Sequence, residues 1–205
     1  MSQSSEQFGR FVEPSGNSKE YLTLHFSPSA SARQERWQNY GLSADFLGDY
    51  FSNFFPGNQI SDHELSQKDT IKSAVSFIAN ELLENSIKYS YDCAQFPITL
   101  SLYLYEERLI FRSVNCAEIA VAARFKQFIR DLLAAPDIDV LFTQQFEKTA
   151  AGSGESCMGL LTMICDYGVE LSWKFQPIDR GKNTIQVDAL AYLDLTKFDN
   201  QLFSN

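Results

Sequence analysis

Alternation of hydrophobic and polar residues predicts several β-strands along this chain. The pattern is clearest over residues 20–27 (EYLTLHFS), where every second side chain is apolar, as on one face of a sheet. Residues 97–116 contain two β-rich runs around a Glu-Glu pair, which predict a hairpin. Two more strands, 169–177 and 183–195, flank the turn-rich sequence IDRGKN. The strands therefore come mainly as hairpins.

Other segments carry apolar residues at helical spacing. They cover residues 33–55, 68–90, 117–135 and 157–168. Pro136 stops the third of these helices, because proline cannot continue a helix, and Gly168 ends the fourth. Hairpins between helices predict an α+β fold. We expect a two-layer α/β sandwich in which a mixed, mainly antiparallel sheet carries helices on one face.

The remaining segments are expected to be irregular. Residues 136–156 show no clear periodicity, and their end, 149–156, is small or polar throughout, which predicts a mobile loop. Residues 1–18 are rich in Ser, Gln, Glu and Gly and predict a flexible tail. A chain of 205 residues suffices for one domain with a sizeable core. We therefore expect a single domain over 19–195 and a short tail over 196–205.

Composition and charge narrow the class of protein. Hydrophobic residues make up 44% of the chain, as in a globular domain rather than a disordered one. The formal net charge of −9 argues against binding to the phosphate backbone of nucleic acids. No apolar run has the length of a membrane span, and the first residues lack the apolar segment of a signal peptide. These features predict a cytoplasmic protein with no membrane partner.

The four cysteines and two histidines do not form a metal-binding pattern. No two cysteines stand in a C-x-x-C pair, and the histidines are far from them in sequence. This argues against a zinc site and is consistent with reduced thiols in the cytosol.

One helical stretch, ANELLENSIKYS at residues 79–90, interrupts its apolar stripe with polar residues. Leu82, Asn85 and Tyr89 follow helical spacing, and Glu81 precedes Asn85 by four residues, so the two polar side chains lie one turn apart on one side. The plain interpretation is an amphipathic helix with polar residues at the edge of its stripe. A second stretch, SGESCMGLLTMICDYGVEL at residues 153–171, has a glycine where a loop enters a helix, which lets backbone N–H groups approach an anion.

Together the two stretches resemble the GHKL, or Bergerat-fold, ATPase superfamily over about residues 70–190. Residues 81–90 look like the family's N-box. The resemblance implies that Asn85 ligates Mg²⁺ and that Glu81 orients or deprotonates the attacking hydroxyl or water. Residues 156–160 are similar to the glycine box that follows the ATP lid. Gly152 and Gly154 would then give the lid its freedom, and the backbone at Met158, Gly159 and Leu160 would hold phosphate.

The adenine box is where the sequence departs from the family. The family places Asp-x-Gly-x-Gly after the N-box hairpin, and its aspartate accepts a hydrogen bond from adenine. Here Asn115 takes the aspartate position, while Ala117 and Ile119 take those of the two glycines. Asparagine can still accept a hydrogen bond but brings no charge, and the methyl group at Ala117 crowds the base. The alternative is a simple strand-to-helix turn. Lys88 likewise reads either as a solvated helix charge or, by the resemblance, as a phosphate contact.

The resemblance implies an ATP- and Mg²⁺-binding bacterial regulator of the anti-sigma-factor or serine/threonine-kinase branch, which includes the Sia-type regulatory kinases. Such a protein phosphorylates or sequesters a partner: a small regulatory phosphoprotein, or a sigma-factor or response-regulator client. A homodimer is compatible with it. A second hypothesis is a catalytically inactive pseudo-ATPase that serves as a protein–protein interaction module, which the altered adenine box favours and the intact Glu81/Asn85 pair opposes. A third is a metabolic enzyme on an unrelated α+β fold.

Overall fold

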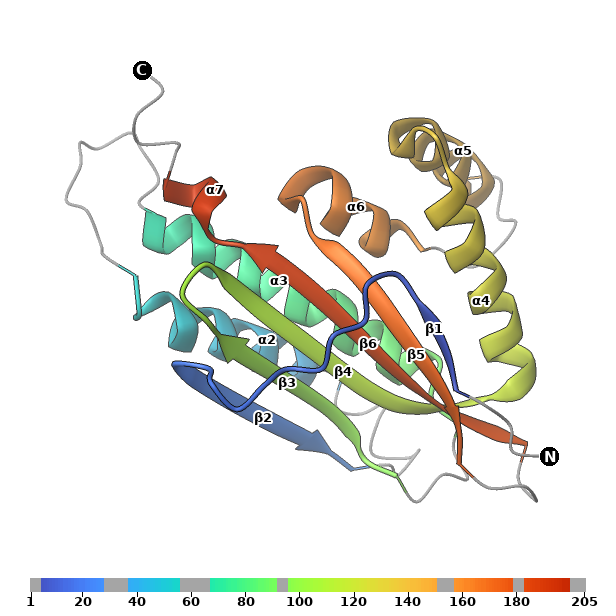
Figure 1. Cartoon of the computed structure of the whole chain (residues 1–205), viewed down its shortest axis with the longest axis horizontal. Coiled ribbons are helices and arrows are strands. Elements are labelled where there is room, and N and C mark those ends of the chain that lie inside the picture. The colour runs from blue at the N-terminus through green and yellow to red at the C-terminus, as the bar shows by residue number, and fades with distance from the viewer. Residues whose placement is uncertain are drawn as a thin grey trace.

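A computed structural model describes residues 5–27, 37–55, 67–91, 96–150, 157–178 and 183–199. In these residues six strands form one sheet in the order β1-β5-β6-β4-β3-β2 (Figure 1). The strands are β1 (Glu6–Phe8), β2 (Glu20–Phe26), β3 (Ile98–Leu104), β4 (Arg108–Glu118), β5 (Glu170–Pro177) and β6 (Thr184–Asp194). All of the pairs between them are antiparallel, so this part of the chain contains no parallel pair of the kind that a mixed sheet would have.

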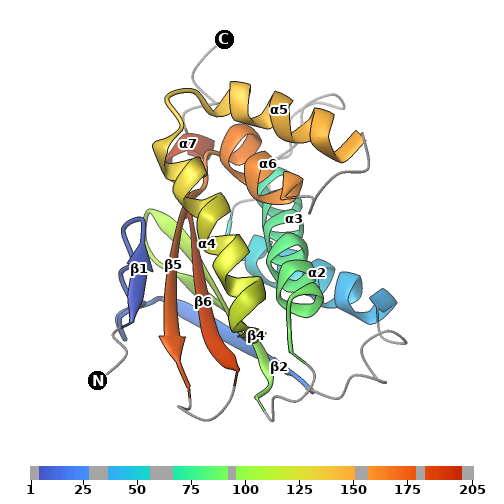
Figure 2. The ribbon, with the colours of Figure 1, turned by 90° about the vertical axis from the view of Figure 1, so that its right-hand side faces the viewer.

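The helices lie on one side of this sheet (Figure 2). They are α2 (Trp37–Ser52), α3 (Gln67–Lys88), α4 (Ile119–Ala134), α5 (Ile138–Ala150), α6 (Met158–Tyr167) and α7 (Thr196–Asp199). The predicted fold class, an α+β two-layer sandwich with helices on one face, is confirmed.

The core between the layers has two parts. In the larger part, α2 and α3 pack against the middle of the sheet, with Leu47, Phe51 and Ile78 fully buried. In the smaller part, α4 covers β5 and β6, and Ile129 packs with Trp173 and Phe175. The helical spacing of apolar residues in α3 produces its buried stripe, and Asp69 in its first turn and Lys88 in its last complement the helix dipole. The site described below lies where the two parts meet.

Two segments that the sequence led us to expect as tails contain secondary structure in their described residues, 5–18 and 196–199. Within residues 1–18, β1 pairs with β5 in the register Glu6↔Phe175 and Phe8↔Trp173. A strand of three residues is too short to show alternation in the sequence, which is why the prediction was wrong. After β6, α7 begins where Asp194 accepts hydrogen bonds from the backbone N–H and hydroxyl of Thr196 (2.9 and 2.6 Å). Asp194 thus caps this short helix.

The irregular segment predicted over 136–156 is helical in its first part. Helix α5 runs from Ile138 to Ala150, and the Asp137 carboxylate accepts a hydrogen bond of 2.9 Å from the Asp139 N–H at its start. Leu141 and Phe142 pack toward the smaller core at the i+3 and i+4 positions from Ile138. That helical spacing is present in the sequence. It was not recognised because the preceding proline and the small residues that follow suggested a loop. Residues 151–156 of the predicted loop lie outside the described residues.

Candidate functional site

The two motifs meet at the contact between α3 and α6. Glu81 lies on α3, and Gly159 lies in the first turn of α6. A Cβ atom added at Gly159 would overlap the carboxylate of Glu81, so only glycine fits at this position without moving the glutamate. The glycine that the sequence singled out therefore allows the Glu81 side chain to lie directly against the start of α6. Glu81 and the start of α6 lie side by side although they are far apart in the sequence.

A cavity of about 40 Å³ lies between α3, α4, α6 and the sheet. Four of the candidate residues line it: Asn85, Asn115, Ala117 and Leu160. Most of its other lining is apolar and comes from side chains that include Val121, Phe125, Trp173 and Val187. A volume of this size holds a few water molecules but no purine ring system. The structure thus brings the predicted residues together around a space smaller than the base they were expected to bind.

The residues that the sequence predicts to meet adenine lie at the end of β4. Asn115 pairs with Val187 of β6 and is only 7% exposed, and Ala117 pairs with Ile185 and is also buried. Strand β4 continues to Glu118, and α4 begins at the next residue, so the predicted start of this helix at 117 is two residues early. The strand passes into the helix with no loop between them. The helix is thereby held close over the cavity, and Val121 and Phe125 from its first two turns form part of the cavity lining.

At the α6 end of the site, the groups available to a ligand are the backbone N–H groups of the first helical turn rather than side chains. The helix begins at Met158, directly after the buried Cys157. Leu160 is buried in the larger core, while Met158 packs against the smaller one. The N–H groups of a first helical turn have no partner within the helix, and they can hold an anion there. Gly154, the remaining glycine-box candidate, lies outside the described residues.

Glu81 is the titratable group nearest to this helix start among the candidates. Burial raises the pKa of its carboxyl above the ordinary value of 4.5, and the charge of Glu84 raises that pKa further. Glu84 in turn accepts a hydrogen bond of 2.9 Å from the Asn80 amide. A carboxyl group with a raised pKa binds a proton more readily, which suits a group that has to accept one.

Lys88 lies apart from the cavity lining. Its side chain is exposed, and Nζ is 5.1 Å from the centre of the Tyr89 ring, in a cation–π contact. This arrangement agrees with the interpretation of Lys88 as a solvated charge at the end of α3. Among the described residues no group of three or more His, Cys, Asp and Glu side chains comes together as a metal site. For a magnesium ion, Asn85 would therefore act with phosphate oxygens and water.

Sequence reasoning missed the polar and aromatic neighbours of the candidates. Ser86 and Ser113 share a buried hydrogen bond of 2.5 Å that ties α3 to β4 beside the cavity. Ser113 precedes Asn115 by two residues on a strand, so the period of two could have placed both on one face. Phe125 lies among several aromatic rings: it stacks on Tyr89 at 6.4 Å and meets Trp173 edge to face at 6.0 Å. Nothing in the sequence indicated that this phenylalanine would border the predicted base site.

Compared with known proteins, the chain matches no protein-family model and no curated protein sequence. No helix in the described part of the chain combines the length and the apolar character needed to cross a membrane.

Proposed function

We propose that this chain is an ATP-binding bacterial regulatory protein of the anti-sigma-factor or serine/threonine-kinase type, which phosphorylates or sequesters a small partner protein. The observation that carries the proposal is the contact between Glu81 and Gly159. Two motifs chosen for their chemistry meet, and a side chain at Gly159 would have to displace the Glu81 carboxylate.

In this proposal the residues of the chain divide the work of holding ATP and moving a proton. The amide oxygen of Asn85 would be the one protein ligand of Mg²⁺, which commonly keeps its other positions for phosphate and water. The N–H groups at the start of α6 would hold phosphate oxygens. Glu81 would accept the proton of the attacking hydroxyl, and its raised pKa supports that assignment. ATP would supply the phosphoryl group.

The adenine end has to change shape for this function. Asn115 and Ala117 border the cavity at the position where the base would lie, but the cavity holds about 40 Å³. A purine fits only if Val121 and Phe125 of α4 move outward. The proposal therefore includes a displacement of α4 side chains, or of α4 itself, when nucleotide binds.

The same small cavity favours a second candidate function, an interaction module that works without nucleotide. Its lining is almost entirely apolar, and Ala117 and Ile119 replace the glycines that would leave space for a base. A protein of this kind would keep the fold and bind its partner through its surface.

Calorimetric titration with ATP in the presence and absence of Mg²⁺ separates the two candidates. The wild-type chain should bind Mg²⁺-ATP. Asn85→Ala should lose the dependence on Mg²⁺, whereas Asn80→Ala, a second asparagine of α3 that bonds to Glu84, should retain it. Glu81→Gln should bind ATP but release no phosphate from it, because the amide cannot accept the proton.

Absence of ATP binding by the folded wild-type protein would reject the kinase proposal and leave the interaction module. Equal Mg²⁺ dependence in Asn85→Ala and wild type would show that the metal is not held where we place it.

A further inference from the structure

The exposed edge of β5 is covered by a segment of the chain that we call the N-terminal strap, residues 6–15. Its first three residues form β1, which pairs antiparallel with β5. The strap then turns and crosses the face of the sheet opposite to α2 and α3 (Figure 1). The turn depends on Gly9, which has φ of 69° and would bring an added Cβ to 2.6 Å from the Leu171 carbonyl oxygen.

On the helix side of the sheet, the strap contacts basic residues of α4. The Glu6 carboxylate lies 2.7 Å from the Lys126 ammonium and 3.7 Å from the Arg130 guanidinium. The Lys126 side chain is only 12% exposed, so Glu6 neutralises a charge that is largely withdrawn from water. Two residues further along the strand, on the same face, Phe8 meets Phe175 edge to face at 5.6 Å, and Arg130 lies over the Phe8 ring at 5.5 Å.

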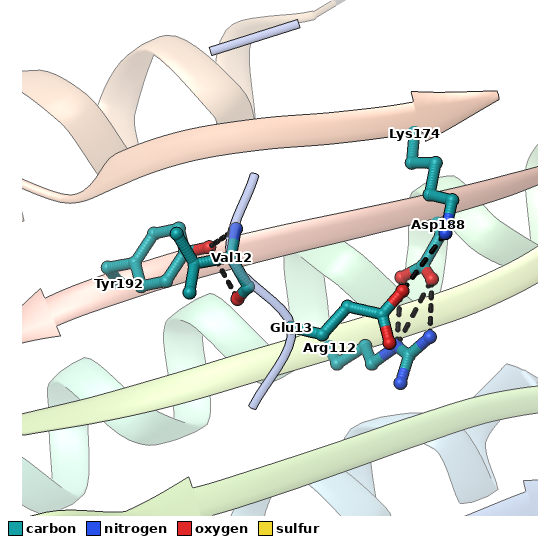
Figure 3. A network of polar contacts seen from close by, with 6 residues as sticks. All are labelled: Val12, Glu13, Arg112, Lys174, Asp188 and Tyr192. Atoms are coloured by element: carbon teal, nitrogen blue, oxygen red, sulfur yellow. Dashed lines mark hydrogen bonds and ion pairs between the residues drawn. The ribbon is translucent and has the colours of Figure 1, made fainter. Parts of the chain in front are cut away.

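On the open face of the sheet, the strap is held by a second set of contacts (Figure 3). The Glu13 carboxylate accepts a hydrogen bond of 2.9 Å from the Lys174 ammonium, which also lies over the Phe11 ring at 5.7 Å. The Val12 N–H donates to the Tyr192 hydroxyl oxygen at 3.0 Å, and that hydroxyl donates to the Val12 carbonyl at 3.1 Å. The surface under the strap therefore presents lysine and arginine side chains beside aromatic rings, in a protein with a net charge of −9.

These contacts hold the strap weakly. A strand of three residues adds few backbone hydrogen bonds, and short strand pairs have little stability of their own. Both carboxylates that anchor the strap are about half exposed, 49% for Glu6 and 55% for Glu13, whereas their lysine partners are 12% and 22% exposed, so water partly screens each pair. A segment held in this way can leave while the sheet and the helices remain folded.

We propose that the groove between the β5 edge and α4 is a binding site for an extended segment of a partner protein, and that the strap is its internal occupant. The segment adds a strand to β5, places a carboxylate between Lys126 and Arg130, and places an aromatic ring two residues later against Phe175. Backbone pairing supplies affinity in this mode of recognition, and the alternate side chains supply specificity. The charge of the groove selects an acidic, aromatic segment. The site does not use nucleotide, so its test is separate from that of the kinase function.

Fluorescence anisotropy with a labelled peptide of residues 5–15 (SEQFGRFVEPS) tests this site in the full chain. The double variant Glu6→Ala/Phe8→Ala should release its own strap and bind the peptide. Wild type should bind it about tenfold more weakly or worse, because its own strap fills the groove most of the time. A peptide with alanine at the Glu6 and Phe8 positions should bind to neither protein. Tyr21→Ala, which removes an exposed ring on β2, is the matched control and should behave as wild type.

Reversal of the charge at Lys126 is a second test of the same groove. Adding Lys126→Glu to the double variant should abolish peptide binding, and a peptide with lysine at the Glu6 position should restore it. If the folded double variant does not bind the wild-type peptide, the groove is not a peptide site. If the wild type is a dimer that the double variant loses, the strap is exchanged between copies, and the proposal of an internal occupant is wrong.

Discussion

Glu81 is the residue at which chemistry and stability conflict most clearly. Burial between α3 and α6 raises the pKa of its carboxyl, so the folded state disfavours the charged form at neutral pH. In the proposed function, this raised pKa would help Glu81 to accept a proton. Its neighbour Gly159 is fixed by the same contact, because a larger residue would displace the carboxylate.

The raised pKa of Glu81 predicts a pH dependence of stability. The folded state binds this proton more tightly than the unfolded state, whose pKa is near 4.5. The contribution of Glu81 to the free energy of unfolding is therefore greatest below pH 4.5 and falls as pH rises through the raised folded pKa. Glu81→Gln should remove this decline and be more stable than wild type at pH 7 to 8, the neutral range about three units above the ordinary carboxyl pKa.

Chemical denaturation at pH values from about 4 to about 8 measures the difference in the free energy of unfolding between Glu81→Gln and wild type. Glu147→Gln, which removes an exposed carboxylate on α5, is the control and should follow the wild-type pH profile. A constant difference between Glu81→Gln and wild type across the range would show that burial does not shift this group.

At the scale of elements, the junction of β4 and α4 determines the size of the candidate site. The strand ends at Glu118, the helix begins at Ile119, and the first two turns of the helix place Val121 and Phe125 in the cavity wall. In the family that the motifs resemble, glycines occupy the positions of Ala117 and Ile119. In this chain both positions carry side chains, and the strand is followed directly by the helix.

Phe125→Leu should enlarge the cavity and strengthen nucleotide binding. The loss of ring contacts with Tyr89 and Trp173 should reduce the free energy of unfolding by about 1–2 kcal/mol, because the side chain is partly buried. Phe128→Leu is the matched control, since Phe128 stacks on Phe125 from the same helix but does not line the cavity.

Calorimetry with Mg²⁺-ATP and thermal unfolding compare the two variants. A similar loss of stability in both, with tighter ATP binding in Phe125→Leu alone, is the expected pattern. Equal ATP affinity in wild type and Phe125→Leu would place the base elsewhere.

Elements with long periodic patterns were predictable, and short or interrupted ones were not. Helix α3 and the hairpins follow their patterns to within a few residues because each buries one face against a broad surface. Strand β1 is specified by the edge of β5 and by two cations of α4, which are distant in the sequence. For the site, motif chemistry assigned Glu81 and the backbone at Gly159 to one nucleotide site but did not predict that the two would touch. The closure of the cavity by Phe125 could not be anticipated, because it depends on the angle at which α4 leaves the sheet.

For the whole molecule, the open face of the sheet is an organised polar surface. Arg112 of β4 and Asp188 of β6 form a bidentate pair, with hydrogen bonds from Nε at 3.0 and 3.2 Å and from Nη2 at 2.6 Å. Asp188 is 2% exposed, and its neighbour Glu13 comes from the strap (Figure 3). The pair links the two central strands and carries part of the surface on which the strap lies.

Asp188→Ala should lower the free energy of unfolding by about 3 kcal/mol, at the lower end of the range for buried pairs because Arg112 keeps some contact with water. Denaturant unfolding measures the loss. Glu106→Ala, which removes an exposed pair with Lys19, should change stability by less than about 1 kcal/mol. Similar small losses in both variants would mean that the central pair contributes no more than a surface one.

The direct passage from β4 into α4 would also affect the rates at which a ligand enters and leaves the candidate site. Because no loop separates the two elements, α4 can swing only about the backbone of Glu118, and its aromatic side chains have to leave the stack around Phe125 together. A cooperative motion of this kind is slower than the diffusion of a small molecule to the surface. If nucleotide binds as proposed, the helix would act as a kinetic gate. The speed at which the site fills would be determined by how often the gate opens, and a molecule captured inside would leave at the same slow pace.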